Sequence, residues 1–129
     1  MLTVGSKAAF SITVDSNNTA ETVGSGSLPV FATPSLAALV EKTACLCIVE
    51  GLEEGCTTVG TLLNIKHLAP STVGVAVKCE CVLKEIDGRR LVFEASVSDN
   101  AGVVGEAYHE RFIIKSASFM DKARGRAEV

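Results

Sequence analysis

The sequence predicts an α+β fold in which a five-stranded antiparallel sheet wraps around one long central helix. Residues 33–51 carry apolar side chains at helical spacing on more than one side, and a helix that is apolar nearly all round is buried nearly all round. Residues 57–114 alternate apolar and polar side chains between turn signals, which is typical of antiparallel strands. Curling one sheet around one apolar helix satisfies both patterns.

Length and composition predict one globular domain over residues 1–129. Hydrophobic residues make up 47% of the chain, which excludes a disordered protein. A net charge of -3, a single Tyr and no Trp argue against a nucleic-acid partner. The apolar stretches are shorter than the roughly 20 residues that span a bilayer, and no signal-peptide pattern opens the chain. We therefore expect a cytoplasmic protein that does not bind membranes.

The five cysteines do not have the spacing of a metal site. Cys45 and Cys47 form a C-x-C pair, as do Cys79 and Cys81, and no His lies at ligand spacing beside them. An odd number of cysteines at apolar positions is typical of small core residues in a reducing cytoplasm. We expect neither a metal nor a cofactor.

The N-terminal part of the chain predicts a strand, a loop and the start of the helix. Residues 2–14 combine β-branched and other apolar side chains without Pro, as strands do. Residues 15–27 are polar and rich in Gly and Ser, and they predict a mobile surface loop able to cover a site. Thr33 then fits the N-cap of the helix, Pro34 fits its first position, and Gly51 supplies the stop.

Four further strands are expected after the helix. Residues 57–67 form the first of them, and residues 73–83 place their apolar side chains on one face of the second. Asp87-Gly88 predicts a two-residue hairpin turn. Residues 91–97 alternate on the returning strand, and a second turn leads into the last strand over residues 103–114. The order is therefore strand, helix and an antiparallel meander.

Four polar side chains are candidates for chemistry: Thr33, Glu41, His67 and His109. Glu41 interrupts a stretch of apolar helix residues, so it either reaches solvent at the rim or has a functional partner. Helix capping is a sufficient role for Thr33, a surface turn for His67, and a structural position for His109. A hydroxyl, a carboxylate and an imidazole are also the groups that acyl transfer requires. The chain has no glycine-rich phosphate loop and no serine-hydrolase motif.

The segment Val30-Phe31-Ala32-Thr33, followed by Glu41, Gly60-Thr61 and His67, resembles the fluoroacetyl-CoA thioesterase branch of the hot-dog acyl-CoA thioesterases. Two later segments share the resemblance: Gly88-Arg89-Arg90-Leu91 and Tyr108-His109-Glu110-Arg111. The resemblance covers nearly the whole chain and implies a hot-dog fold, in which the sheet encloses the central helix. It also implies that Thr33, Glu41 and His67 act on the substrate and that Gly60 lines the acyl pocket.

The activity that this resemblance implies is hydrolysis of a short-chain acyl-CoA thioester to free acid and CoA. The amides of Ser35 and Leu36, at the positive end of the helix, would polarise the thioester carbonyl. Thr33 would be the nucleophile or an orienting hydroxyl, His67 the proton shuttle, and Glu41 its orienting partner or the base acting on water. Candidate contacts for the CoA phosphates are Lys66, Arg111, Lys115 and Arg124.

Two departures from the family pattern and one alternative bear on this function. Pro34 replaces a glycine, which removes an N–H donor, and residues 23–27 lack the aromatic side chains that would shape a tight lid. A general short-chain acyl-CoA thioesterase is therefore expected rather than one specific for fluoroacetyl-CoA. The alternative is a non-catalytic module that binds or senses acyl-CoA on the same fold.

The predicted sheet also favours a homodimer or a higher homo-oligomer, because natural proteins rarely leave open sheet edges bare. Thr33 and Glu41 are eight residues apart, which is about 12 Å along a helix axis. A hydrogen bond joins atoms within about 3.2 Å. Either the chain bends back before the helix, or Glu41 reaches the site from the partner subunit. The helix start set by Pro34 favours the second arrangement.

Overall fold

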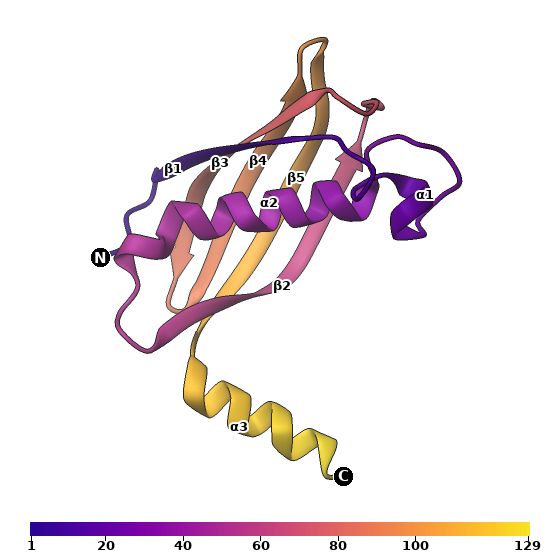
Figure 1. Ribbon diagram of the computed structural model, residues 1–129. Helices are drawn as coiled ribbons and strands as arrows, with labels where there is room; N and C mark the ends of the chain where they lie inside the picture. The colour runs from indigo at the N-terminus through magenta and orange to yellow at the C-terminus, as the bar shows by residue number, and fades with distance from the viewer.

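The computed structural model describes residues 1–129, and in it one curved antiparallel sheet carries a long helix on its concave face (Figure 1). In chain order the elements are β1 (Lys7–Thr13), α1 (Ala20–Val23), α2 (Thr33–Ile48), a 3₁₀ turn (Val49–Gly51), β2 (Cys56–His67), β3 (Ala76–Asp87), β4 (Arg90–Asp99), β5 (Gly102–Lys115) and α3 (Ser116–Ala127). The strands lie in the order β1-β3-β4-β5-β2, and every neighbouring pair is antiparallel. The predicted α+β architecture is confirmed.

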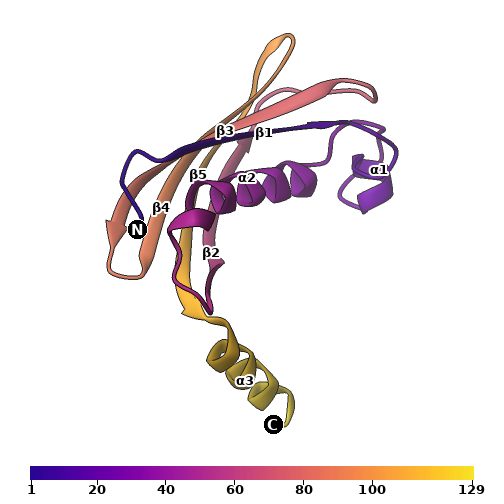
Figure 2. The ribbon, with the colours of Figure 1, turned by 60° about the vertical axis from the view of Figure 1, so that its left-hand side comes forward.

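One face of α2 forms the centre of the core. The buried residues of this helix are Leu36, Leu39, Val40, Thr43, Ala44 and Ile48. Leu46 on the other face is 42% exposed, and Val49 just beyond the helix is 59% exposed. The expectation that the helix is buried most of the way round is wrong within one chain, because the sheet covers a single face of it (Figure 2).

Strands β3 and β4 supply most of the sheet's side of the core. Their inward residues alternate as predicted, and they are Val77, Cys79, Cys81, Leu83, Leu91, Phe93, Ala95 and Val97. The turn between the strands lies at Gly88-Arg89, one residue later than expected, because Asp87 pairs with Arg90 as the last rung. Gly88 has a φ of 61°, a conformation that glycine adopts without steric cost.

A β-bulge breaks the alternation of β2. The register against β5 shifts between Gly60 and Leu62, so one extra residue is accommodated there. Before the bulge, Thr58 is buried; after it, Leu63 and Ile65 pack against the core. The single period-two pattern expected over residues 57–67 is therefore wrong at its centre, because the bulge changes which residues face inward.

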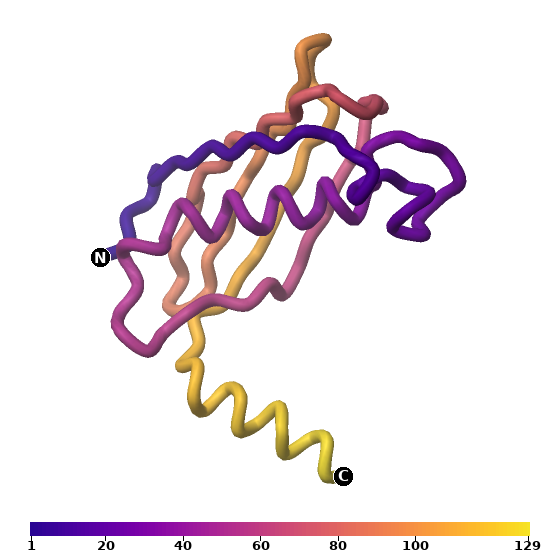
Figure 3. Tube along the Cα trace, viewed as in Figure 1, coloured from indigo at the N-terminus to yellow at the C-terminus, as the bar shows by residue number.

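Two segments differ from a simple sheet and helix. Residues 15–27 contain α1 and the buried Thr19, which bridges to Phe31, so this part of the chain is tied to the body rather than being the free loop expected. The C-terminal helix α3 leaves the end of β5 and projects away from the sheet (Figure 3). None of the helices is both long enough and apolar enough to cross a membrane.

Candidate active site

The first part of the site joins the start of α2 to the end of β2. Thr33 Oγ1 lies 2.8 Å from His67 Nδ1, which is hydrogen-bonding distance. Thr33 is the first residue of α2, and Ala32 rather than Thr33 is the N-cap. The expected capping role of Thr33 is therefore wrong. Because its hydroxyl caps nothing, it is free to bond to the imidazole.

A cleft of about 300 Å³ opens beside this pair. Its walls come from α1 and the loop after it, from the start of α2, and from the turn after β2: Ala20, Ser25, Val30, Phe31, Thr33, His67, Leu68, Ala69 and Pro70. Most of these side chains are small or apolar. The cleft therefore accepts an apolar group of limited size and presents it to one hydroxyl and one imidazole.

His67 has the properties of a general base. Burial lowers the pKa of its imidazole below the ordinary value of 6.5, and the backbone of Ala69 opposes part of this effect. The imidazole is therefore neutral at pH 7, so Nδ1 can accept the hydroxyl proton of Thr33. Its Nε2 is buried without a hydrogen-bond partner in the chain. The ring of Phe31 contacts the imidazole edge-on, with 6.4 Å between ring centroids.

The start of α2 offers fewer free amides than the sequence suggested. The amide of Leu36 donates to the carbonyl of Ala32 at 2.9 Å, and the side chain of Leu36 is fully buried. Leu36 therefore has no donor for a substrate, in contrast to the expectation. The amide of Ser35 has no acceptor in the chain. It lies at the positive end of the helix dipole, where a developing oxyanion is stabilised.

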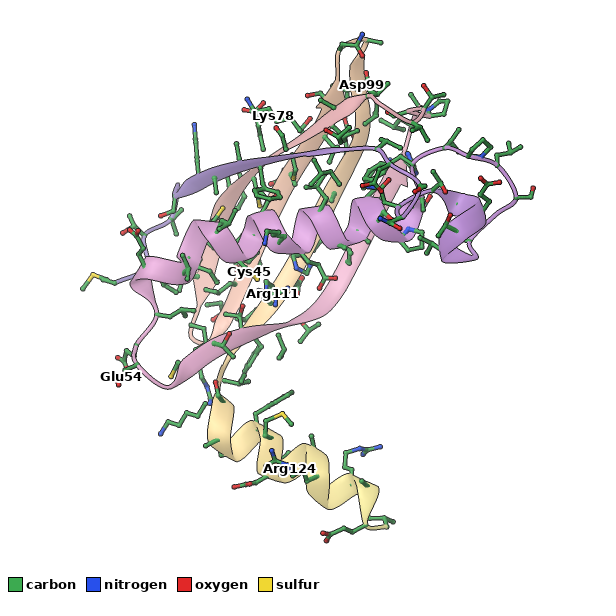
Figure 4. All side chains as sticks on the ribbon, viewed as in Figure 1. Cys45, Glu54, Lys78, Asp99, Arg111 and Arg124 are labelled. Carbon is green, nitrogen blue, oxygen red and sulfur yellow. The ribbon has the colours of Figure 1, made fainter.

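Glu41 belongs to a second group of side chains, midway along α2. Its Oε2 lies 3.3 Å from Nη1 of Arg111, which comes from β5. Arg111 is held by Thr58 of β2, since its Nε donates to the hydroxyl at 2.8 Å and its Nη2 to the carbonyl at 3.0 Å. His109 Nε2 lies 3.1 Å from the same Nη1. Figure 4 labels Arg111 between the middle of α2 and β2.

Gly60 faces this second group directly. A Cβ atom on Gly60 would lie 2.7 Å from Oε2 of Glu41, 3.2 Å from Cε1 of His109 and 3.3 Å from Nη1 of Arg111. Any side chain would displace the carboxylate, so only glycine leaves Glu41 where it is. Gly60 itself is exposed, so the carboxylate side of this group opens to the surface.

Comparisons with known proteins show the family to which the chain belongs. A family model described as fluoroacetyl-CoA-specific thioesterase matches residues 14–117. The chain belongs to this thioesterase family. The fluoroacetyl-CoA thioesterase of Streptantibioticus cattleyicolor is 32% identical over 95 residues, which are 74% of this chain and 68% of that protein.

Solved structures show the same fold. A mutant of the fluoroacetyl-CoA-specific thioesterase FlK has 26% identity and a TM-score of 0.91 over 98% of each chain. A second FlK mutant, in complex with acetyl-CoA, has 26% identity and a TM-score of 0.92 over 97% of this chain and 98% of that one. A thioesterase-superfamily protein of Thermus thermophilus has 24% identity and a TM-score of 0.91 over 99% and 95% of the two chains.

These relatives identify the chain as an acyl-CoA thioesterase with a hot-dog fold, and they lend no support to a non-catalytic module.

The structure brings Thr33 and His67 together but leaves Glu41 with Arg111. Arg111 was a candidate for the CoA phosphates, but its side chain is only 8% exposed and is already bonded inside the protein. That candidate role is therefore wrong.

The sequence does not reveal that His109 and Arg111 surround Glu41. His109 and Arg111 both point inward from β5, with Ala107 before them and Ile113 after them on the same face. The opposite face of β5 also carries apolar residues, such as Phe112, so alternation alone did not identify the inward side. The sequence shows only that His109 and Arg111 are polar and spaced by two on one predicted strand, and their burial is visible only in the structure.

Proposed function

We propose that this thioesterase hydrolyses short-chain acyl-CoA with Thr33 as the nucleophile and His67 as its base. The observation that carries the proposal is the hydrogen bond of 2.8 Å between Thr33 Oγ1 and His67 Nδ1. A hydroxyl needs a neighbouring base to become nucleophilic, and a neutral imidazole at this distance is such a base. The pair lies in a cleft that is otherwise mostly apolar.

The reaction follows from this pair in two stages. His67 takes the hydroxyl proton while Thr33 Oγ1 bonds to the thioester carbon, and the amide of Ser35 stabilises the oxyanion. The C–S bond then breaks, CoA leaves as a thiol with the proton from His67, and the acyl group remains as an ester of Thr33. Water attacks the ester, its proton passes through His67 back to Thr33, and the free acid leaves.

The walls of the cleft support a short acyl group without a strict requirement for fluoroacetyl. Ala20 and Ser25, from α1 and the loop after it, line the cleft with small side chains, and Phe31 is the large side chain beside the imidazole. No aromatic residue occurs between Val23 and Ser27 to tighten the lid. The acyl group is therefore selected by the size of the cleft more than by specific contacts.

We propose that the enzyme acts as a homodimer joined along β2. The sheet order leaves β1 and β2 as its edges, and open edges invite pairing with another strand. β2 is 12 residues long against 7 for β1, and its Leu62 is 47% exposed. Two copies of β2 running antiparallel about a two-fold axis continue the sheet and cover this residue.

This dimer completes the catalytic site. The side chain of Glu41 is 44% exposed, and Nε2 of His67 is buried without a hydrogen-bond partner in its own chain. In the proposed dimer, the Glu41 carboxylate of one chain approaches Nε2 of His67 in the other. A carboxylate there would orient the imidazole and stabilise its protonated form.

The cysteines support a cytoplasmic location for this enzyme. All five are free thiols, and Cys79 and Cys81 are buried in the core. Burial raises the pKa of the Cys79 thiol, so this group stays protonated and unreactive. Thiols that close no disulfide are typical of proteins in a reducing compartment.

The test of the catalytic assignment is release of free thiol from a series of CoA esters, from acetyl to hexanoyl and including fluoroacetyl. We expect turnover of the short members, a large loss of kcat in Thr33→Ala, and retained turnover in Thr33→Ser. With a slow substrate, mass spectrometry should detect an acyl ester on the peptide that contains Thr33. Turnover by Thr33→Ala close to that of the wild type would exclude Thr33 as the nucleophile.

A further inference from the structure

The guanidinium of Arg111 is enclosed by partners from three directions. Thr58 accepts two of its hydrogen bonds, through its hydroxyl and through its carbonyl, at 2.8 and 3.0 Å. The remaining terminal nitrogen, Nη1, faces both Glu41 and His109, at 3.3 and 3.1 Å. The two bonds to Thr58 fix where the guanidinium sits. Nη1 carries two N–H groups, so it can donate to His109 and to the carboxylate of Glu41 at once.

The contacts of His109 define its protonation state without ambiguity. Its Nδ1 lies 2.8 Å from the carbonyl oxygen of Leu62, and a carbonyl only accepts, so Nδ1 carries the hydrogen. Its Nε2 faces Arg111, and a guanidinium only donates, so Nε2 carries a lone pair. Both neighbours therefore require the same neutral tautomer.

The surroundings of His109 maintain this state. The residue is 1% exposed, and the ring of Phe93 from β4 packs against it with 6.0 Å between centroids. The charged groups that act on the imidazole are Arg111 on its own strand and Glu41 on α2. Burial lowers the pKa of His109 most, and the charge of Arg111 lowers it further, while Glu41 and the Leu62 carbonyl act in the opposite direction.

We propose that His109 is a positioning residue for catalysis: its neutral imidazole accepts from Arg111 and thereby holds the guanidinium, and through it the carboxylate of Glu41, in the catalytic orientation. The proposal rests on the function of Glu41 put forward above. His109 touches neither Thr33 nor the cleft beside it, so it acts through Arg111 alone.

A purely structural role predicts something different. If His109 only filled space beneath Gly60, an apolar side chain of similar size would serve, and turnover would follow stability. In the proposed role, an apolar replacement leaves one N–H of Nη1 buried without an acceptor. Because the guanidinium is planar, the whole group then shifts, and Glu41 loses its alignment while the fold persists. A residue that offers an acceptor to Nη1 would restore part of the lost turnover.

The test compares His109→Leu, which removes the acceptor, with His109→Gln, which offers an amide oxygen and does not titrate. We expect kcat to fall at least about 10-fold in His109→Leu, the effect of roughly one positioning hydrogen bond, with KM little changed. His109→Gln should recover part of that loss. Tyr108→Phe is the matched control, since Tyr108 is the adjacent residue on the opposite, outer face of β5. Equal kcat in His109→Leu and Tyr108→Phe would overturn the proposal.

Two further measurements separate this proposal from the function assigned to Glu41. In a Glu41→Gln background, His109→Leu should lower kcat no further, because both changes remove the same alignment; an additional 10-fold loss would contradict a role through Glu41.

In the wild-type enzyme, ¹⁵N NMR should find the Nδ1–H tautomer of His109 persisting below pH 6.5. The Nε2–H tautomer of His109, or protonation of its imidazole at the ordinary pKa of 6.5, would contradict the hydrogen bond from Arg111 to Nε2. This measurement needs no variant, so it applies even if every variant fails to fold. Full activity of Glu41→Gln would overturn the role of Glu41 instead.

Discussion

The hydroxyl of Thr33 is available for chemistry because it does not cap the helix. A Thr at the N-cap bonds to an amide of the first turn, which occupies its oxygen. In this protein Ala32 takes that position, and Thr33, one residue later, points its oxygen at His67. A shift of one residue at the helix start therefore frees this hydroxyl from capping and places it beside an imidazole.

Replacing His67 with Ala should lower turnover by about 100-fold or more, because general bases contribute about 10² to 10⁴. The fold should persist, since His67 is only half-buried at the end of an edge strand. Thiol release and thermal melting measure the two effects. The control is Lys78→Ala, an exposed position on the outer face of β3. Turnover within a few-fold of the wild type would show that His67 is not the base.

Acid should destabilise this protein through both histidines. Burial lowers the pKa of His67 and of His109 below their ordinary 6.5. At a pH between the lowered pKa of the folded protein and 6.5, the unfolded chain binds more protons than the folded one. The free energy of unfolding therefore falls as the pH falls below 6.5. His109→Gln should make the melting temperature less dependent on pH across this range. A wild-type melting temperature that is constant from pH 7 to 5 would contradict the lowered values.

At the scale of elements, the bulge in β2 determines which side chains meet α2. Without the extra residue, Gly60 and His67 would face opposite sides of the sheet, because side chains alternate with period two. With it, Gly60 contacts Glu41 and His67 contacts Thr33, so both ends of β2 serve the same helix. The bulge thus allows one strand to line both parts of the site.

The sequence predicted the regular elements well and this irregular one not at all. Strand β3 alternates from Ala76 to Leu83 and β4 from Phe93 to Val97, because one face of each is buried in the core. The bulge carries no comparable signal, since Gly60 and Thr61 are compatible with either register. The family resemblance indicates Thr33, Glu41, His67 and Gly60. The partners of Glu41 depend on contacts among α2, β2 and β5, which the sequence pattern does not show.

Gly60→Ala should lower turnover while leaving the fold largely intact. The new Cβ would lie 2.7 Å from Oε2 of Glu41, and the end of that flexible side chain would move away. We expect a fall in kcat of about 10-fold and a loss of stability of about 1 kcal/mol. Gly125→Ala in α3 is the matched control, since nothing lies within 4 Å of its added Cβ. Equal kcat in the two variants would mean that the position of Glu41 does not matter.

At the scale of the whole molecule, one chain holds two groups of polar side chains that do not meet. The Thr33 and His67 pair lies at the start of α2, and the Glu41 and Arg111 pair lies further along the same helix. Eight residues of helix, about 12 Å, separate Thr33 from Glu41. The exposed Leu46 belongs to the face of α2 that the sheet leaves uncovered. Both features are accounted for if two chains combine.

A mixed dimer tests this arrangement directly. One chain carries Thr33→Ala and the other Glu41→Gln, each with strongly reduced turnover as a homodimer, and two different affinity tags isolate the mixed species. If each site takes Thr33 from one chain and Glu41 from the other, one site has both residues and the other has neither, so about half of the wild-type turnover per dimer should return. If both residues serve from one chain, each site lacks one residue, and the mixed dimer stays as inactive as its parents.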